Sequence, residues 1–418
     1  MAARRIIPKP FISKKGVDYS LVKFHLGVDI GKSRHKACLH NLEKDSFSGI
    51  FSIDVTREGF EKLCNTLNKY STNPEDFLIG LEATGSYGTT LAYYLLAKGY
   101  KVVEINPYQA NKFRQAQGKK AKTDAIDARS LAAFIGIGQH KPLSIPDPAI
   151  DNLRELTRFR TELIQDRSSL INQLKQTLNT LYPEIGQVLA SLDSPSCLDL
   201  LVACPGPSYI LQAGESSLTD RLIKASHGKL GEEQAHELVE AAQKTIGLLI
   251  RQEALAIKVK ILGERILGLN LAIEKVEKQV REIYHGLPNK PAGFPVGEEV
   301  SLATLVAEIE DIGRYATIKQ FLSHLGWCPR VYQSGSFNME HPPMSHAGNR
   351  YVRHLIWLLS IVAIRDVPEY RAYFQRRVAS GKGKMDVLVA VGRKLLSAFY
   401  AILKSGNPYK PRQEVIPA

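Results

Sequence analysis

The sequence predicts an α/β domain at the N-terminus, then a long helical stalk and a mostly α-helical C-terminal domain. Short apolar runs alternate with amphipathic segments in the first third, which is typical of a mixed sheet covered by helices. Leucines recur at helical spacing from Leu153 to Leu178 and predict a long amphipathic helix. Beyond residue 288, proline and glycine separate shorter apolar segments that are typical of several helices.

Three apolar runs of the first domain are expected to form buried strands, at 24–30, 77–82 and 101–105. The segments 35–40 and 48–55 alternate in polarity and predict antiparallel neighbours of the first strand. Amphipathic segments predict helices over 59–70, 89–98 and 122–134.

The second half of the stalk is predicted from a proline-free stretch of helical spacing at 232–284. With the first long helix it indicates an antiparallel hairpin or coiled coil. In the last domain, helices are expected over 300–309, 349–364, 368–380 and 385–404, with a loop at 325–336. The predicted division is a basic arm (1–21), an α/β domain (22–145), a stalk (146–287) with an unassigned insert at about 183–230, and a C-terminal domain (288–410).

The charge of the chain indicates a polyanionic partner. The 418 residues include 55 Lys and Arg against 42 Asp and Glu, and the excess lies at both ends: +8 over residues 1–150, −2 over 151–287 and +7 over 288–418. Nucleic acid is the commonest polyanion for such a protein. Absence of a long apolar run or signal peptide argues against membrane and secreted classes. Five scattered cysteines without a CxxC pair argue against a disulfide framework or zinc site and favour the cytoplasm.

Four carboxylates stand where α/β domains gather binding sites. Asp29 and Glu82 end predicted buried strands, and Asp124 and Asp127 lie three residues apart on one face of a predicted helix. Converging carboxylates repel one another unless cations neutralise them, and oxygen ligands suit Mg²⁺ or Mn²⁺. The pattern predicts a metal site for phosphoryl transfer. The alternative is four unrelated surface or helix-capping carboxylates.

Basic side chains surround the predicted helix that carries Asp124 and Asp127. Beside an acidic metal site they are expected to position nucleic-acid phosphates, although a solvated charged face is the alternative. These residues are Lys112, Arg114, Lys119, Lys120 and Lys122.

A second group of polar residues lies in the C-terminal domain. Ser334 precedes Gly335 in a predicted loop, and Arg330, Arg350 and Arg353 are the guanidiniums expected to hold phosphate near it. A serine beside a glycine is, by itself, mainly typical of a turn. The Gly-x-Ser-x-Gly elbow of hydrolases is absent from the sequence, so ordinary serine hydrolase chemistry is unsupported.

Six short motifs occur in a specific order along most of the chain: Gly27–Lys32, Gly80–Gly85, Lys122–Ala128, Phe321–Pro329, Ser334–Gly335 and Gly348–Arg350. In order and spacing they resemble the DEDD transposases of the insertion-sequence 110 (IS110) family, relatives of the pilin-gene invertases. The resemblance implies an RNase H-like, RuvC-like N-terminal fold and a C-terminal transposase domain. It also implies a DNA recombinase in the bacterial cytoplasm, associated with the nucleoid.

The resemblance further implies roles for particular residues and partners. Asp29, Glu82, Asp124 and Asp127 would be the catalytic, Mg²⁺-binding tetrad, and Ser334 would form a covalent phosphoserine link with DNA. The tetrad of a neighbouring subunit would complete the active site, in a dimer or tetramer. A structured bridge RNA would pair with donor and target DNA, so that the protein itself grips backbones.

Several alternatives remain open from the sequence. The chain has Ser345-His346-Ala347 where the family usually carries Lys or Arg, which leaves Ser345, and also Ser336, as rival nucleophiles. A metal-dependent RuvC-like nuclease or resolvase, a DNA invertase and a non-catalytic nucleic-acid scaffold are alternative functions. An actin-like ATPase would need a second phosphate loop that the sequence does not show.

Overall fold

The computed structural model describes residues 21–82, 87–116, 124–137, 140–143, 145–329, 333–334, 337–338, 344 and 348–411. The chain divides into two compact units, residues 1–146 and 147–418. Each unit is built around hydrophobic clusters of its own.

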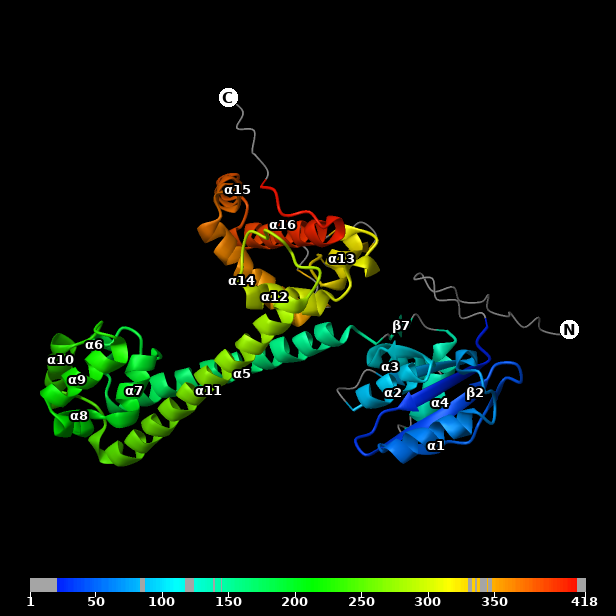
Figure 1. The fold of residues 1–418 in the computed structure, drawn as a ribbon, viewed down its shortest axis with the longest axis horizontal. Helices are drawn as coiled ribbons and strands as arrows, with labels where there is room; N and C mark the ends of the chain where they lie inside the picture. The colour runs from blue at the N-terminus through cyan, green and yellow to red at the C-terminus, as the bar shows by residue number, and fades with distance from the viewer. Residues whose placement is uncertain are drawn as a thin grey trace, which may run out of the picture. The chain divides into compact units, whose positions relative to one another are not determined.

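The first unit contains the predicted mixed sheet (Figure 1). Its strands follow the order β3-β2-β1-β5-β6-β7, with β4 also paired to β2. Strand β1 is antiparallel to β2 but parallel to β5, and β5 is parallel to β6. The strands are β1 (Phe24–Asp29), β2 (Arg34–Asn41), β3 (Ser46–Phe47), β4 (Phe51–Asp54), β5 (Phe77–Glu82), β6 (Lys101–Ile105) and β7 (Lys141–Pro142).

Helices cover both faces of this sheet. Helices α1 (Arg57–Leu67) and α2 (Thr89–Ala97) pack on the face that carries Leu26 and Ile79. Helices α3 (Pro107–Ala116) and α4 (Asp124–Ile135) pack on the opposite face. Because side chains alternate along a strand, Asp29 shares its face with Gly27, and Glu82 shares its face with Gly80. Both carboxylates therefore lie on the face covered by α3 and α4.

Helix α4 approaches β1 closely at Gly27. A Cβ atom on this residue would lie 2.2 Å from the Ala132 nitrogen and 2.4 Å from the Ala128 oxygen. Any larger side chain would push the helix away from the sheet. The same helix carries Asp127, so this contact brings Asp127 toward the end of β1.

Helix α3 is not among the predicted helices, because Asn106-Pro107 directly follows the predicted strand at 101–105 and is typical of a turn. Proline is well suited to the first turn of a helix, where its missing N–H costs no hydrogen bond. Asn106 caps the helix, since its Oδ1 accepts hydrogen bonds from the backbone nitrogens of Tyr108 (2.9 Å) and Gln109 (3.3 Å).

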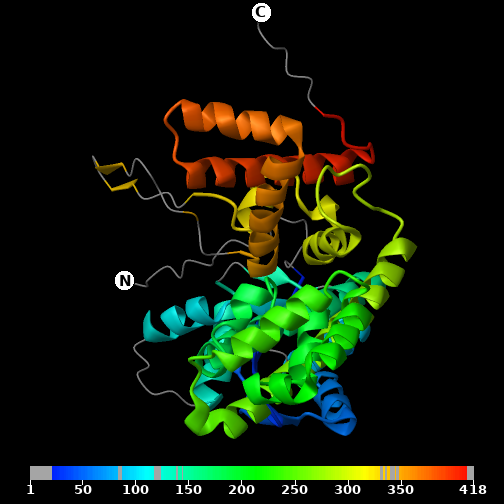
Figure 2. The ribbon, with the colours of Figure 1, turned by 90° about the vertical axis from the view of Figure 1, so that its left-hand side faces the viewer.

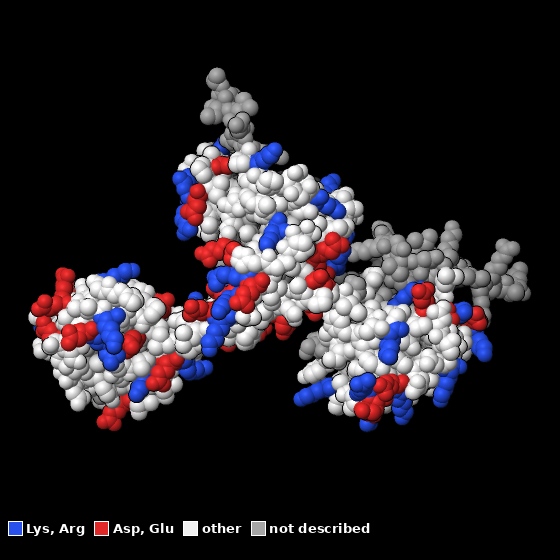
Figure 3. Space-filling view, in the orientation of Figure 1, with Lys and Arg blue, Asp and Glu red and all other residues white. Residues whose placement is uncertain are grey.

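The second unit contains the predicted hairpin of two long helices, α5 (Pro148–Leu181) and α11 (Gln252–Gly286). Arg160 binds Glu277 at 2.7 Å, and Arg167 donates to Asn270 at 3.2 Å. Residue numbers rise along α5 as they fall along α11, so the helices are antiparallel. Figure 3 shows acidic and basic side chains intermixed along this stalk.

The prediction of one helical stretch over 232–284 is wrong. Helix α10 ends at Gln243, and a turn of 3-10 helix (η2, Leu249–Arg251) precedes α11. Gly247 lies at this break, where a Cβ atom would meet the Leu181 carbonyl oxygen at 1.9 Å. The unassigned insert is helical and packs with α10 around the far end of the stalk. Its helices are α6 (Ile185–Val188), α7 (Pro195–Ala203), α8 (Pro207–Ala213) and α9 (Glu215–Ser226), followed by α10 (Glu232–Gln243).

The C-terminal part of the second unit confirms the predicted helices near their expected bounds. Helix α14 crosses the antiparallel pair α15 and α16, and the short hairpin of β8 and β9 projects from the helices (Figure 2). This hairpin occupies part of the segment that was predicted to be a loop. The elements are α12 (Glu299–Ile309), α13 (Ile318–His324), β8 (Gln333–Ser334), β9 (Phe337–Asn338), α14 (Arg350–Asp366), α15 (Pro368–Ala379) and α16 (Lys384–Ser405).

Two turns of 3-10 helix, η1 (Pro74–Asp76) and η3 (Ile312–Arg314), complete the described elements. No helix in the described part of the chain is both long and apolar enough to cross a membrane.

The contact at Gly27 predicts the effect of one methyl group. Gly27→Ala should lower the free energy of unfolding by about 2–3 kcal/mol, because the backbone of α4 must move away from β1. Gly49→Ala is the matched control, since its Cβ would meet nothing within 4 Å. Urea unfolding of the full chain measures both variants. Equal stability of the two would contradict the close packing of α4 on β1.

Candidate active site

Asp29 and Glu82 lie at the ends of two neighbouring parallel strands. Val28 of β1 is in register with Leu81 of β5, so the next residues along each strand are Asp29 and Glu82. Both side chains lie on the α4 face of the sheet, and both line one pocket of about 310 Å³. The two carboxylates are thus placed side by side by strand pairing alone.

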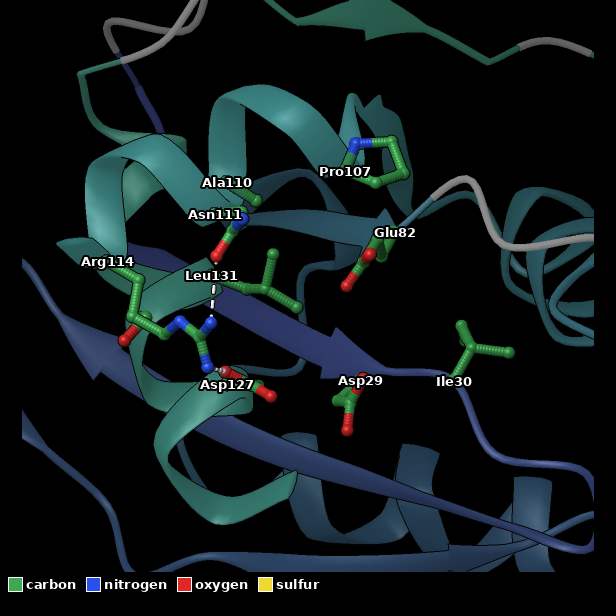
Figure 4. A pocket seen from close by; sticks show the side chains of 10 residues that line it. Asp29, Ile30, Glu82, Pro107, Ala110, Asn111, Arg114, Asp127 and Leu131 are labelled. Carbon is green, nitrogen blue, oxygen red and sulfur yellow. Dashed lines mark hydrogen bonds and ion pairs between the residues drawn. The ribbon is translucent and has the colours of Figure 1, made fainter. Parts of the chain in front are cut away.

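Asp127 reaches the same pocket from α4, and Figure 4 shows its carboxylate directed toward the side of the pocket where Asp29 lies. Asp124 is the first residue of this helix, but its side chain lies outside the described part of the structure. Three of the four predicted carboxylates, from two strands and one helix, are therefore brought together. The rest of the lining consists of Ile30, Pro107, Ala110, Asn111, Arg114, Ser130 and Leu131.

Arg114 enters the pocket from α3 and binds Asp127. Its Nη1 lies 3.1 Å from Asp127 Oδ1, and its Nη2 donates to Asn111 Oδ1 at 2.8 Å (Figure 4). The two side chains of the ion pair are only 14% and 16% exposed, so the pair is weakly screened by solvent. Arg114 thus balances one negative charge of the pocket and fixes the orientation of the Asp127 carboxylate.

The donor atoms of the pocket match a hard divalent cation in type, because they are carboxylate and amide oxygens. Asp29, Glu82 and Asp127 would supply the charges that such a cation needs. Within the described side chains, no three acidic, histidine or cysteine residues are grouped closely enough to hold one ion. Arg114 occupies one oxygen of Asp127, so metal binding requires this ion pair to share or release that carboxylate.

Asn111 and Ser130 also line the pocket, although neither was predicted from the sequence. Asn111 lies one helical turn before Arg114, and Ser130 lies three residues after Asp127. Both spacings can be found in the sequence. The spacing of Asn111 and Arg114 places them on one face only if the segment is helical, and α3 was not predicted. Of the other predicted phosphate contacts, Lys112 is exposed, with its Nζ 5.7 Å from the centre of the Tyr108 ring. Lys119, Lys120 and Lys122 lie outside the described residues.

Ser334 lies in β8, where it pairs with Phe337 of β9. Its side chain is outside the described part, as are Arg330, Ser336 and Ser345. Arg350 and Arg353 both lie in the first turns of α14. The Arg350 guanidinium stacks 4.8 Å from the centre of the Tyr351 ring.

A buried carboxylate that sequence analysis did not identify supports the start of α14. The Glu308 side chain, on α12, is only 1% exposed and accepts two hydrogen bonds from Arg158 of the stalk, at 2.6 and 2.8 Å. These bonds raise the pKa of the Arg158 guanidinium, which stays charged. Glu308 also accepts a hydrogen bond from Nδ2 of Asn349. The network joins the stalk, α12 and α14.

Asn349 is held so that its other amide atom caps α14. Its Oδ1 accepts from the backbone nitrogens of Tyr351 at 2.9 Å and Val352 at 3.2 Å. The preceding Gly348 has φ of +105°, and a Cβ there would lie 2.4 Å from the Gly326 nitrogen. The Gly-Asn pair therefore sets the direction from which the chain enters α14, the helix that carries Arg350.

Two family models match the chain. A DEDD transposase model of the IS110 type, described as "Transposase", matches residues 26–183, and the model "Transposase IS116/IS110/IS902 family" matches residues 295–375. Together they cover more than half of the sequence. The chain belongs to this transposase family. It is therefore an enzyme that catalyses phosphoryl transfer on DNA. The pocket described above lies within the residues that the DEDD model matches.

Relatives of the transposase are similar over nearly their whole length. The IS116 protein of Streptomyces clavuligerus is 25% identical over 93% of this chain and 97% of its own. A pilin gene-inverting protein of Moraxella bovis is 22% identical over 93% of this chain and 98% of its own. Thermus thermophilus RuvC aligns at 12% identity with a TM-score of 0.23, covering 29% of this chain and 99% of RuvC. The RuvC-like assignment rests on the mixed sheet and on the match to the DEDD family model. The structural alignment with RuvC adds no support to it, because its TM-score is low.

The buried Arg158–Glu308 pair predicts a stability effect in the transposase. Arg158→Met should lower the free energy of unfolding by about 2–3 kcal/mol, because Glu308 is left buried without its cation. The effect stays below that of a fully buried pair because Arg158 is 39% exposed.

Arg221→Met is the matched control, since Arg221 and Asp199 are 42% and 49% exposed. Such surface pairs contribute about 0–1 kcal/mol. Urea titration of both variants gives the comparison, and equal losses would show that the buried network does not stabilise the start of α14.

Proposed function

We propose that this transposase is guided by a structured bridge RNA and recombines DNA through a phosphoserine intermediate at Ser334. One observation carries the catalytic part of the proposal: Asp29, Glu82 and Asp127 come from three separate elements and line one pocket. Carboxylates from separate elements that line one pocket are the usual ligands of a divalent cation.

The covalent step is a transesterification in which each bond broken is replaced. The Ser334 hydroxyl oxygen bonds to phosphorus of a DNA strand, its proton leaves, and the strand's ester oxygen departs as a hydroxyl after taking up a proton. A hydroxyl of the second DNA then attacks the phosphoserine and releases Ser334. Because the phosphodiester energy is retained in the covalent link, neither step needs ATP or hydrolysis.

The tetrad would serve this reaction by holding Mg²⁺, or Mn²⁺. Asp29, Glu82, Asp124 and Asp127 are the expected ligands, and the bound ion would stabilise negative charge on the reacting phosphate oxygens. Arg330, Arg350 and Arg353 would bind the phosphate itself, because guanidinium matches phosphate in charge and geometry. Lys112, Lys119, Lys120 and Lys122 would bind the DNA backbone near this site, while Arg114 orients Asp127.

Guidance by RNA is supported by the distribution of charge. Both ends of the chain are basic, at +8 and +7, and the sequence contains no recognisable base-reading motif. This arrangement suits a protein that binds nucleic-acid backbones while base pairing selects the sequence.

DNA inversion is a second candidate outcome of the same chemistry. Its support is the similarity to the Moraxella bovis pilin gene-inverting protein over 98% of that protein.

The alternative to both is a metal-dependent nuclease or resolvase that lacks the serine step. The next experiment distinguishes this alternative from the serine mechanism.

The serine step is tested by trapping the adduct. Donor and target DNA, RNA from the native element and Mg²⁺ are incubated with the protein and resolved on denaturing gels. The unmodified chain should give a protein–DNA adduct, and Ser334→Ala should abolish it, reducing recombination more than about a thousandfold. Ser336→Ala and Ser345→Ala are matched controls that should retain the adduct. Cleavage without an adduct, unchanged by Ser334→Ala, would establish a nuclease.

Sharing of the active site between subunits is tested by mixing. Ser334→Ala and Asp29→Asn should each be inactive alone. If serine and tetrad come from different subunits of a dimer, half of the randomly mixed dimers contain one intact site, so about a quarter of the sites should recover. Co-expression and the same adduct gel measure this. No recovery would place both components of each site in one subunit.

A further inference from the structure

A groove of about 610 Å³ lies between α15, α16 and the segment that follows α16. Figure 2 shows the two helices lying side by side. Much of the groove lies beyond residue 375, where the family match ends. The part of the lining that could bind a ligand consists of Tyr373, Arg393, Lys394, Ser397, Asn407 and Lys410.

The cations of this groove have no acidic partners. Arg393, Lys394 and Lys410 form no ion pair with any residue in the described ranges. Arg393 and Lys410 are exposed to solvent, and Lys394 is half-buried. Between residues 350 and 410 the sequence has twelve Lys and Arg against three Asp and Glu, so neighbouring charges reinforce the positive field. Figure 3 shows basic side chains, with acidic ones between them, over the edge where α15 lies in Figure 1.

The aromatic lining fixes the position of one cation. Lys394 Nζ lies 4.5 Å from the centre of the Tyr373 ring, a cation–π contact that holds the flexible side chain at the groove. Holding the ammonium in place reduces the entropy lost when an anion binds it.

The acidic residue of the groove is already engaged. Glu369 Oε2 accepts a hydrogen bond from the Tyr409 hydroxyl at 2.8 Å. Burial raises the pKa of Tyr409, so this hydroxyl stays protonated and remains the donor. The Tyr409 nitrogen also donates to the Ala292 oxygen at 3.1 Å, which anchors the segment after α16 as one wall of the groove.

We infer that this groove binds the phosphate backbone of nucleic acid, through Arg393, Lys394 and Lys410. The inference adds a contact surface to the proposed function and depends on it only for the class of ligand. Three unpaired cations lining one groove match the spaced negative charges of a backbone, and they provide no reading of bases. The backbone can belong to DNA or to RNA, and the same variants distinguish the two.

The test compares two double variants of the full chain that each lose two positive charges. Arg393→Ala with Lys394→Ala removes groove cations. Lys382→Ala with Lys384→Ala removes two exposed cations outside the groove, one from the turn after α15 and one from the first residue of α16. Fluorescence anisotropy measures binding to a duplex DNA and to a single-stranded RNA of mixed sequence, without Mg²⁺, over about 50–200 mM salt.

The groove variant should bind at least about tenfold more weakly, and its salt dependence should fall by nearly two units of log K per log salt for duplex DNA. The control should lose less than about threefold. Loss for DNA alone or for RNA alone identifies the source of the backbone. Equal losses in both variants, or no loss in the groove variant, would overturn the inference. Because no chemistry is measured, the result is independent of the Ser334 adduct test.

Tyr373→Ala separates the positioning of Lys394 from its charge. This variant keeps every positive charge but removes the ring that holds the ammonium. Binding should weaken about threefold with an unchanged salt dependence, because the number of phosphate contacts is the same. A variant that binds as tightly as the unmodified chain would show that the ring does not position Lys394.

Discussion

The close approach of α4 to β1 at Gly27 is the constraint on which the catalytic unit depends. A helix that contacts a strand backbone this closely leaves no room for a side chain, so its axis and the position of each of its residues are fixed. Asp127 lies beside Ala128, whose carbonyl makes that contact. Strand pairing places Asp29 next to Glu82, and the helix adds the third carboxylate. Backbone packing, rather than side-chain attraction, therefore brings like charges together.

Arg114 shows how the same pocket limits its own repulsion. It comes from α3, binds Asp127 and is itself held by Asn111. Among the described lining residues, one guanidinium stands beside three carboxylates, and carboxylate oxygens are ligands that suit a divalent cation. Stability and function thus make opposite demands on Asp127, and an ion pair that can be shared or released satisfies both.

The second unit also contains a carboxylate that is paired with an arginine, and here the carboxylate is buried. Glu308 connects the stalk residue Arg158 to Asn349, the N-cap of α14. The start of α14 is therefore tied to the stalk through a nearly inaccessible carboxylate. Farther along the chain, Arg393 and Lys394 of α16 and Lys410 after it form no ion pair with any described residue. The buried Glu308 carboxylate is thus paired within the domain, whereas these three groove cations remain available to a polyanion.

Much of this protein follows from local sequence. Apolar runs predicted the central strands of the sheet, leucine spacing predicted the first stalk helix, and the order of six short motifs indicated the family. Helix α3 and the break at Gly247 were missed, because a proline-led helix and a glycine inside helical spacing are ambiguous until a neighbour is known. Only tertiary structure decided that Arg114 binds Asp127 and that Glu308 supports Asn349. Such partners are far apart in sequence, and their pairing depends on how whole elements pack rather than on any local pattern.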